Sequence, residues 1–466
     1  MSVRPLVFFL RRVGLPPQLL VLAGADVLAL VGTALTVFFM RLLWGGSLDA
    51  PAYRVLLPLL FLAPFFGLSL GLYRSIALPP HRELKAVFGM VSIIYALALL
   101  TLFLVKSGDI FSRLVLLGGW GAALLALPAL RCFCRRHLAR RWWWGSPLII
   151  LGRSRPARDI WHWLRRRPEF GLKPVQILAL PAEPEACDAL LRRALQRYPN
   201  AIGLVLLHTG DEKNAELLQQ ANQHFRQLLV VPQVSRAMRR YWVTPCDLGI
   251  VTGLLLSQNL RDKRRLRVKR AIDVLLCLLT MPLLLPLGLA LALAIRLDSP
   301  GPVFYRQERL GQHGQPLRIF KFRTMQANAD ALLEALLEQN PALRLEWQRD
   351  HKLKHDPRIT RMGRFLRKTS LDELPQLINV INGGMSLVGP RPIVAAEIGK
   401  YGHVYEGYCR VKPGITGLWQ VSGRNNTSYA QRVAYDHYYI SNWSVWMDIW
   451  ILGKTVPVVL TGYGAY

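Results

Sequence analysis

Acidic residues are scarce in this sequence. Asp and Glu together number 29 against 59 Lys and Arg, which gives a formal net charge of +30 at pH 7. An excess of this size requires an anionic partner or an anionic surface. The charge alone would suggest a nucleic-acid binder, but no recognition motif accompanies it, so we expect no nucleic-acid partner. Anionic lipid headgroups and phosphorylated substrates are the better candidates.

Cysteine pairs are also lacking. The six cysteines are scattered, without a CxxC spacing, at Cys132, Cys134, Cys187, Cys246, Cys277 and Cys409. This spacing indicates neither a zinc site nor a disulfide framework. We therefore expect free thiols facing a reducing compartment. No cleavable signal peptide is apparent either, because the first apolar run is long enough to span a membrane.

Long uncharged runs account for much of the 52% hydrophobic content. Crossing a bilayer takes roughly 20 residues, and four runs reach or approach that length: 19–40, 55–73, 86–105 and 114–130. We predict a bundle of four transmembrane helices over residues 1–135. Its larger basic clusters alternate with poorer loops, so both ends of the bundle should be cytoplasmic. Asp26, inside the first run, is either a functional group or a structural one near the interface.

The middle of the chain alternates short apolar runs with helical stretches. Runs at 148–151, 175–180, 202–207 and 228–231 are typical of buried strands, with helices expected at 157–166 and 213–225. This alternation predicts a cytoplasmic Rossmann-like α/β module over residues 145–257. A dinucleotide fingerprint needs several glycines after the first strand, and only Gly152 is present. A structural or regulatory role is therefore expected for this module.

A strongly basic stretch at 261–270 precedes an uncharged run of 22 residues, 274–295. The basic stretch should lie on anionic headgroups. Pro282 and Pro286 lie inside the run, and interior prolines kink a helix. Two interpretations are even at this point. The run is either an ordinary kinked spanning helix, or a re-entrant helix at about 270–296 that bends at Pro286 and returns to the leaflet it entered.

The segment 370–376 holds the strongest candidate for chemistry, the adjacent acids Asp372 and Glu373. Ser370 and Glu373 have the spacing of a capping box, which predicts a helix start. Acids there can simply complement the helix dipole. The surroundings favour a chemical role for the pair over a purely structural one. Basic residues precede it at Arg358, Arg361, Arg364, Arg367 and Lys368. An ionised Asp in such an electropositive pocket could attack a phosphate.

Other cations are presented by turns rich in glycine and proline. Arg391 ends the segment 383–391, Arg424 follows 412–423, and Lys321 and Arg323 alternate with apolar residues in 320–325. Guanidinium groups match phosphate oxygens two at a time. Each cation could be a solvated surface residue, but together they would line a pocket for a diphosphate.

These motifs carry a family resemblance. The stretch 269–466 resembles the catalytic domain of the bacterial sugar transferases known as monotopic phosphoglycosyl transferases. Five motifs match that family in order: Lys-Arg-x-x-Asp from Lys269, then 321–325, 371–374, 388–392 and 413–417. The four predicted membrane helices and the α/β module resemble the large members that act on hexoses. The resemblance implies an α/β phosphoglycosyl transferase domain over residues 265–466 with a re-entrant helix.

The resemblance also implies roles for residues. Asp372 would attack the sugar-bearing phosphate of a UDP-hexose, releasing UMP, and undecaprenyl phosphate would take the phosphosugar from the aspartyl intermediate. Glu373 would hold Mg²⁺. Pro286 would break the membrane helix, although Leu285 stands where the family often has Ser. The phosphate or uridine contacts would come from Arg367, Arg391, Arg424, Lys321 and Arg323.

The resemblance further implies a place in the cell and a substrate. The protein would lie in the bacterial inner membrane as a multi-pass protein, with its catalytic domain on the cytoplasmic face. It would start O-antigen, capsule or exopolysaccharide synthesis. Short carboxy-terminal stretches, 442–446 and 464–466, resemble members that transfer galactose 1-phosphate. Glucose, an N-acetylated sugar and a non-catalytic scaffold are the alternatives, and a homodimer is plausible.

Overall fold

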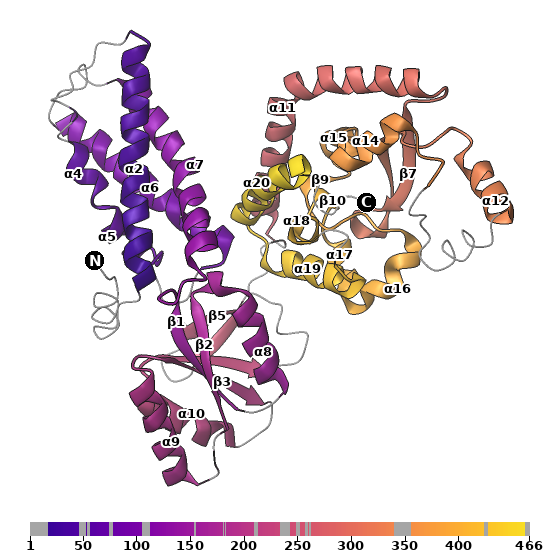
Figure 1. The fold of residues 1–466 in the computed structure, drawn as a ribbon. Helices are drawn as coiled ribbons and strands as arrows, with labels where there is room; N and C mark the ends of the chain where they lie inside the picture. The colour runs from indigo at the N-terminus through magenta and orange to yellow at the C-terminus, as the bar shows by residue number, and fades with distance from the viewer. Residues whose placement is uncertain are drawn as a thin grey trace. The chain divides into compact units, whose positions relative to one another are not determined.

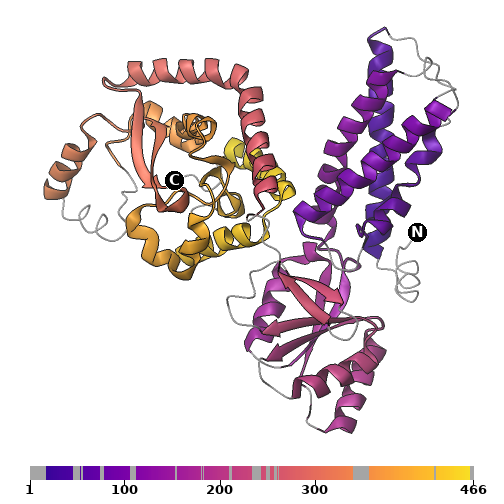
Figure 2. The ribbon, with the colours of Figure 1, turned by 180° about the vertical axis from the view of Figure 1, so that it is seen from behind.

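The protein is seen here in a computed structural model, which divides into two compact units, Met1–Arg239 and Arg240–Tyr466 (Figures 1 and 2). The sequence predicted three domains. The bundle and the part of the α/β module up to Arg239 fall in the first unit. The residues that the structure describes are 17–45, 53, 56–73, 78–104, 112–152, 155–179, 181, 183–208, 213–233, 243–247, 252–256, 260, 262–339, 356–423 and 427–461.

Three helices of the first unit are long and apolar enough to cross a membrane: α2 (Pro17–Leu43), α6 (Pro80–Leu104) and α7 (Arg113–Leu138). The second predicted span, 55–73, is not one long helix, and this corrects the prediction of four. It forms the short helices α4 (Leu57–Leu60) and α5 (Ala63–Ser69), each with a proline in its first turn. Proline is tolerated at a helix start but breaks an interior, so the chain restarts at Pro58 and Pro64.

Asp26 belongs to a buried ionic network that joins the three long helices. Arg131 Nη1 lies 2.6 Å from Asp26 Oδ2, and Arg131 Nε lies 2.5 Å from Glu83 Oε1. Glu83 also pairs with Arg135, and the Tyr73 hydroxyl donates to Asp26. Buried charges persist when they are paired and hydrogen-bonded. The contacts therefore favour the structural interpretation of Asp26.

The first unit also contains a four-stranded parallel sheet in the order β2-β1-β3-β4. Its strands are β1 (Ser146–Leu151), β2 (Leu172–Leu178), β3 (Ile202–His208) and β4 (Leu228–Gln233), close to the four predicted runs. The intervening helices are α8 (Arg155–Arg166), α9 (Pro184–Arg197) and α10 (Lys213–His224).

Alternate residues of β1 enter different apolar clusters. Ile149 packs with residues of α9 and α10, whereas Ile150 packs with residues of α8. Successive side chains of a strand point to opposite faces, so helices cover both faces of the sheet. The parallel α/β arrangement predicted for this segment is confirmed.

The second unit begins with an antiparallel hairpin, β5 (Val243–Asp247) and β6 (Thr252–Leu256), which the sequence analysis did not foresee. The long helix α11 (Lys263–Asp298) follows, with Pro282 and Pro286 inside it. Figure 1 shows that α11 is sharply bent, as the prolines predicted.

Both ends of α11 pack on this unit. Cys277 lies in one apolar cluster with Val380, and Ile295 lies in another with Leu366. Several leucines between these two contacts are exposed, including Leu283 at 76%. The middle of α11 therefore projects from the rest of the unit, and the segments on both sides of it pack against the unit.

The remaining elements of the second unit carry the candidate site. They include the hairpin β7 (Phe304–Leu310) and β8 (Pro316–Phe322), and the parallel pair β9 (Ser386–Val388) and β10 (Gly414–Thr416). The α-helices are α12 (Ala329–Gln339), α14 (Arg361–Thr369), α15 (Gln376–Ile381), α16 (Ile398–Tyr401), α17 (Tyr405–Cys409), α18 (Leu418–Ser422), α19 (Tyr429–Asn442) and α20 (Val445–Thr461). A 3-10 turn, η6 (Leu371–Glu373), lies between α14 and α15.

Candidate active site

The acid pair lies in a tight connection between two helices. α14 ends at Thr369, and Ser370 takes a left-handed conformation with φ of 59° as its cap. The short turn η6 then carries Asp372 and Glu373 before α15 begins at Gln376. The predicted capping box is wrong, because the Ser370 side chain does not cap this turn. Ser370 terminates the preceding helix, so its backbone lacks the extended conformation of an N-cap.

Lys321 is the cation nearest to the acid pair. Its Nζ donates to Glu373 Oε1 at 2.9 Å and lies 3.9 Å from Asp372 Oδ2. The Asp372 side chain is 16% exposed, and Glu373 is 28% exposed. β8 carries Lys321, so the hairpin and the helical turn together bring the predicted residues into contact.

The pKa of Asp372 is raised to about 6, chiefly because the carboxyl is buried. Lys321 opposes this effect most strongly, and Arg367 opposes it less, while the neighbouring Glu373 adds to the rise. The expectation that surrounding cations keep the acid ionised therefore misses the larger effect of burial. With a pKa of about 6, about nine-tenths of Asp372 is still ionised at pH 7.

A pocket opens beside the acid pair. Lys321 and Glu373 line it, and the predicted Arg391 lines it from the loop after β9. The sequence analysis missed three further polar lining residues, Arg309, Gln376 and Gln420. Gln376 stands three residues after Glu373, and this closeness in sequence could have suggested it. No local sequence pattern indicated Arg309 as a site residue, because its position in the pocket depends on the pairing of β7 with β8.

Arginines concentrate at the Arg391 side of the pocket. The Arg391 guanidinium lies 5.6 Å from the centre of the Trp419 ring, and that of Arg432 lies 4.8 Å from it. Burial, and then the charge of Arg391, lower the pKa of both Arg309 and Arg432. Mutual repulsion of this kind would be relieved by a bound anion.

Arg391 is presented by a tightly held loop. The Gly389 N–H donates to Thr416 O at 2.9 Å, and the Gly414 N–H donates to Pro390 O at 2.8 Å. A Cβ on Gly389 would lie 2.6 Å from Lys412 O, so only glycine fits there. The loop is therefore fixed against the segment that precedes α18.

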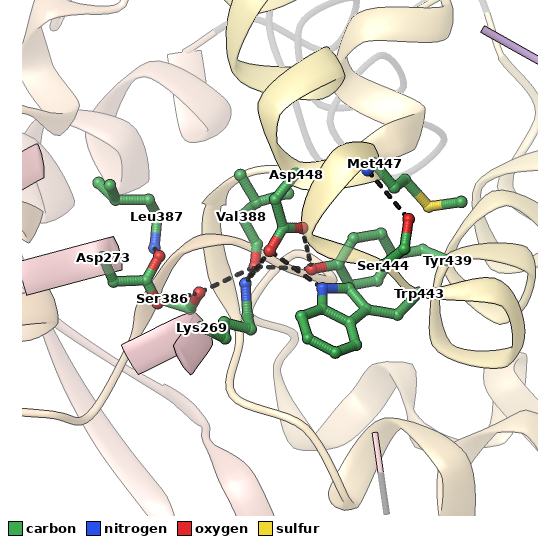
Figure 3. Close-up of polar contacts among 10 residues, drawn as sticks. All are labelled: Lys269, Asp273, Ser386, Leu387, Val388, Tyr439, Trp443, Ser444, Met447 and Asp448. Carbon is green, nitrogen blue, oxygen red and sulfur yellow. Dashed lines mark hydrogen bonds and ion pairs between the residues drawn. The ribbon is translucent and has the colours of Figure 1, made fainter. Parts of the chain in front are cut away.

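Figure 3 shows how the strand before this loop is anchored. The Val388 carbonyl accepts hydrogen bonds from Lys269 Nζ at 3.0 Å, the Tyr439 hydroxyl at 3.0 Å and Ser386 Oγ at 2.9 Å. Lys269 is also paired with Asp448 at 2.6 Å. Helices α11, α19 and α20 thus hold one carbonyl group three residues before Arg391.

Two more residues of the Lys-Arg-x-x-Asp motif hold parts of the site. Asp273 accepts from Ser386 Oγ at 2.7 Å and from the Leu387 N–H at 3.3 Å. Arg270 donates to the Val380 and Ile381 carbonyls at the end of α15. A cation there satisfies carbonyls that lack helical partners. The motif at the start of α11 therefore supports both the Arg391 strand and the helix after the acid pair.

The other predicted cations lie in different places. Arg367 Nε donates to Thr324 Oγ1 at 3.0 Å, and its charge interacts with Asp372. Arg323 is buried and donates to Pro300 O and to Ser299 O and Oγ, which ties the end of α11 to β8. These contacts favour a structural role for Arg323. Arg424 lies outside the described residues.

The carboxy-terminal aromatic residues lie in two different environments. Tyr439 and Trp443 are each 1% exposed and belong to an apolar cluster, so they are core residues. Tyr438 is 38% exposed. The Trp443 Nε1 also donates to Asp448 Oδ2 at 3.0 Å, which joins it to the anchor in Figure 3.

The acid pair fits a magnesium ion. Among the described residues, no three His, Cys, Asp or Glu side chains gather as a metal cluster. Mg²⁺ is commonly held by one or two carboxylates together with substrate phosphates, and it does not require such a cluster. The oxygen donors of Glu373 and Asp372 suit this type of site, and Glu373 lines the pocket.

Comparison with known proteins places the chain in a family. The family model described as bacterial sugar transferase matches residues 264–462. An undecaprenyl-phosphate galactose phosphotransferase of Salmonella typhimurium is 38% identical over 406 residues, covering 83% of each chain. A UDP-galactose-lipid carrier transferase of Erwinia amylovora is 35% identical over 82% of each chain. A UDP-glucose:undecaprenyl-phosphate glucose-1-phosphate transferase of Xanthomonas campestris pv. campestris is 32% identical over 96% of this chain and 94% of its own.

The chain therefore belongs to the bacterial sugar transferase family, as the ordered motifs predicted. The long apolar helices agree with a membrane protein. The predicted class, a phosphoglycosyl transferase, is confirmed by the same relatives.

Proposed function

We propose that this protein transfers hexose 1-phosphate from a UDP-hexose to undecaprenyl phosphate and releases UMP, in the first membrane step of polysaccharide synthesis. The observation that carries the proposal is the contact of Lys321 with both acids, in a pocket that also presents Arg391. Relatives that cover most of the chain have names that describe transfer from a UDP-sugar or to undecaprenyl phosphate.

Asp372 is the proposed nucleophile. Its carboxylate oxygen attacks the phosphorus that bears the sugar, and the bond from that phosphorus to the bridging oxygen breaks. UMP leaves with this oxygen and its electron pair. A phosphate oxygen of undecaprenyl phosphate then attacks the aspartyl phosphorus and restores the free carboxylate. Two displacements at one phosphorus let the two substrates react in turn.

Cations around the pocket offset the charge of the incoming diphosphate. Lys321 lies between the two acids and can shift toward a phosphate oxygen near Asp372. Arg391 and Arg309 line the other side of the pocket, where a forked guanidinium can hold two phosphate oxygens. Fixed positive groups of this kind stabilise charge that moves onto UMP as it leaves. We assign Arg367 a supporting part through its interaction with Asp372, and we retain Arg424 as a proposed contact.

Glu373 is the proposed holder of Mg²⁺. When bound, the ion would offset the negative charge of the substrate phosphates. Glu373 itself accepts a hydrogen bond of 2.9 Å from Lys321 Nζ, and this bond keeps Lys321 beside Asp372. This arrangement gives Glu373 a positioning role as well.

We also propose that α11 is a re-entrant membrane helix, with the catalytic unit on the cytoplasmic face. A spanning helix would have its ends on opposite sides of the bilayer. Here both ends pack on one unit, through Cys277 and Ile295, while several leucines between them, such as Leu283, are exposed. The bend in Figure 1 and the two interior prolines support the same proposal. This position keeps Asp372 near the interface, where a lipid phosphate and a soluble nucleotide sugar can meet.

Galactose is the proposed sugar, because the Salmonella and Erwinia relatives are named for galactose. Glucose is the second candidate, because the Xanthomonas relative covers 96% of the chain and is named for glucose.

The test is UMP release by the purified protein with undecaprenyl phosphate, Mg²⁺ and each of several UDP-sugars. Turnover with UDP-galactose alone is the expected result. Turnover with UDP-glucose alone would support the proposed reaction but would show that the sugar is glucose and not galactose. No UMP with any sugar, from folded protein, would leave a non-catalytic scaffold as the better explanation.

A further inference from the structure

The α/β module carries exposed cations and aromatic rings at the end where the chain enters it from the bundle. We name this the basic aromatic surface and define it by Arg140, Arg141, Trp142, Trp163, Arg167 and Lys173. All six are exposed. None of them belongs to the candidate active site, which lies in the other unit.

Hydrogen bonds place this surface beside the end of the bundle. Lys173 Nζ donates to Trp142 O at 3.2 Å, so the start of β2 lies next to the chain that leaves α7. The Gly145 N–H donates to Gln18 Oε1 at 3.2 Å, and Gln18 is in the first turn of α2. The surface therefore adjoins the end of the bundle where α2 begins and α7 stops.

Three consecutive tryptophans mark the same boundary. Trp144 is 3% exposed and Trp143 is partly buried, and both pack with the apolar cluster of the bundle. Trp142 is 45% exposed. Tryptophan is enriched where a membrane protein meets the headgroup layer. The packed tryptophans thus fix the edge of the bundle, and Trp142 extends from that edge.

Trp163 is a second exposed ring with a fixed orientation. It is 48% exposed, although α8 buries Leu164 against the sheet. Its ring packs 4.9 Å from that of Phe170, and the Arg167 guanidinium lies 5.5 Å from its centre. An apolar ring held beside a cation suits an interface that is apolar on one side and charged on the other.

The charge around these rings is mostly positive. The segment 160–173 contains Arg165, Arg166, Arg167 and Lys173 but a single acid, Glu169. In the part of the chain that the structure describes, Arg165, Arg166 and Arg167 form no ion pair with an acid. Clusters of Lys and Arg next to a transmembrane helix attract anionic lipids.

We propose that the basic aromatic surface binds anionic phospholipid headgroups of the bilayer that holds the bundle. The cations contact headgroup phosphates, and Trp142 and Trp163 lie at the level of the headgroups. The module is then a membrane-docked part of the protein, and its position depends on the lipid composition. This goes beyond the transfer reaction and does not depend on it.

The test uses the full-length protein in nanodiscs of phosphatidylcholine alone or of phosphatidylcholine mixed with phosphatidylglycerol. Amide hydrogen exchange is measured over residues 160–173. We expect slower exchange with phosphatidylglycerol, by about five-fold or more, since each cation at an anionic surface contributes about a factor of five in affinity. High salt should abolish the difference, because it screens exposed charges.

Two variants with equal charge loss decide the assignment. Arg141→Gln with Arg167→Gln should remove the dependence on phosphatidylglycerol. The control, Arg192→Gln with Arg193→Gln, removes two exposed cations from α9 and should retain it. Equal exchange in both lipids, or the same loss in the control, would overturn the proposal. Protection that follows protein concentration instead of lipid would identify a second copy as the occupant and would also overturn it.

Discussion

Lys321 contacts Glu373 more closely than Asp372, with its Nζ at 2.9 Å from one carboxylate and 3.9 Å from the other. Glu373 therefore positions the ammonium, and Asp372 receives its charge without a direct hydrogen bond. In the proposed reaction, an Asp372 oxygen that accepts no hydrogen bond from Lys321 has its lone pairs available for attack. The two acids thus take different parts although they are adjacent in the chain.

Asp372→Asn should reduce UMP release by more than about 10³-fold, because the amide cannot act as the nucleophile. Burial raises the pKa of Asp372 to about 6, so the ionised carboxylate is unfavourable in the folded state at pH 7. The neutral amide should therefore not lower the thermal unfolding temperature. Glu406→Gln, at an exposed position on α17, is the matched control and should retain activity. Normal turnover by D372N would rule out the nucleophile assignment.

The rate should fall as pH is lowered through about 6, because protonation of Asp372 removes the nucleophile. This fall forms the acidic limb of the pH–rate profile. It is expected in kcat/KM, which reports ionisations of the free enzyme, and a pH series of initial rates measures it. Above the limb the rate should level off as Asp372 becomes fully ionised. A flat profile between pH 5 and 7 would contradict the proposed role, since about half of Asp372 is protonated at pH 6.

Lys321→Met should move this acid limb to higher pH. Lys321 is the strongest influence that lowers the pKa of Asp372, so its loss leaves burial less opposed. Arg318→Gln removes a charge from the same strand at a position that is 72% exposed, and its limb should not move. If both variants shift the acidic limb equally, the shift results from the change in net charge and not from loss of the contact between Lys321 and Asp372.

Asp448→Asn should raise the KM for the UDP-sugar more than it lowers kcat. The change weakens the pairing with Lys269 and thereby loosens the hold on the Val388 carbonyl, three residues before Arg391. Weakening a buried pair also costs stability, by up to about 3 kcal/mol, which thermal unfolding would record. Direct binding of UDP separates the two effects. A fully retained affinity for UDP in folded D448N would mean that the anchor is structural only.

Pro286→Ala should straighten α11 and lower activity, because a straight helix of this length cannot return both ends to one unit. A cysteine introduced as E308C, at a position 72% exposed, would report the side of the membrane by labelling with an impermeant thiol reagent. Pro128→Ala, in the long apolar helix α7, is the control. Unchanged labelling and activity in P286A would show that the bend has another cause.

The sequence was most informative where chemistry depends on neighbours in the chain. Asp372 and Glu373 are adjacent, and the parallel strands of the α/β module are continuous apolar runs, so both could be predicted. The break between α4 and α5 was missed, although Pro58 and Pro64, which stand at the two helix starts, could have suggested it. The capping box failed for a local reason. The spacing of Ser370 and Glu373 does not reveal that Ser370 ends the helix before it.

Residues brought together by strand pairing were the ones that sequence reasoning missed or misplaced. Arg309 reaches the pocket because β7 pairs with β8 in a register that no local pattern specifies. Lys321 and Arg323 were expected to share one face by alternation. β8 ends at Phe322, however, so the alternation does not extend to Arg323, which turns to Ser299 instead.

The anchor of α11 also constrains the order in which the protein matures. Lys269 binds Asp448, which follows it by 179 residues in the chain. During synthesis, Lys269 at the start of α11 leaves the ribosome long before Asp448. Until Asp448 is made, the Lys269 ammonium lacks this partner and stays in water or on lipid headgroups. Contacts so distant in sequence form late. The proposed membrane insertion of α11 is thus not stabilised by this ion pair until α20 is made, and a chain truncated before Asp448 would lack the pair.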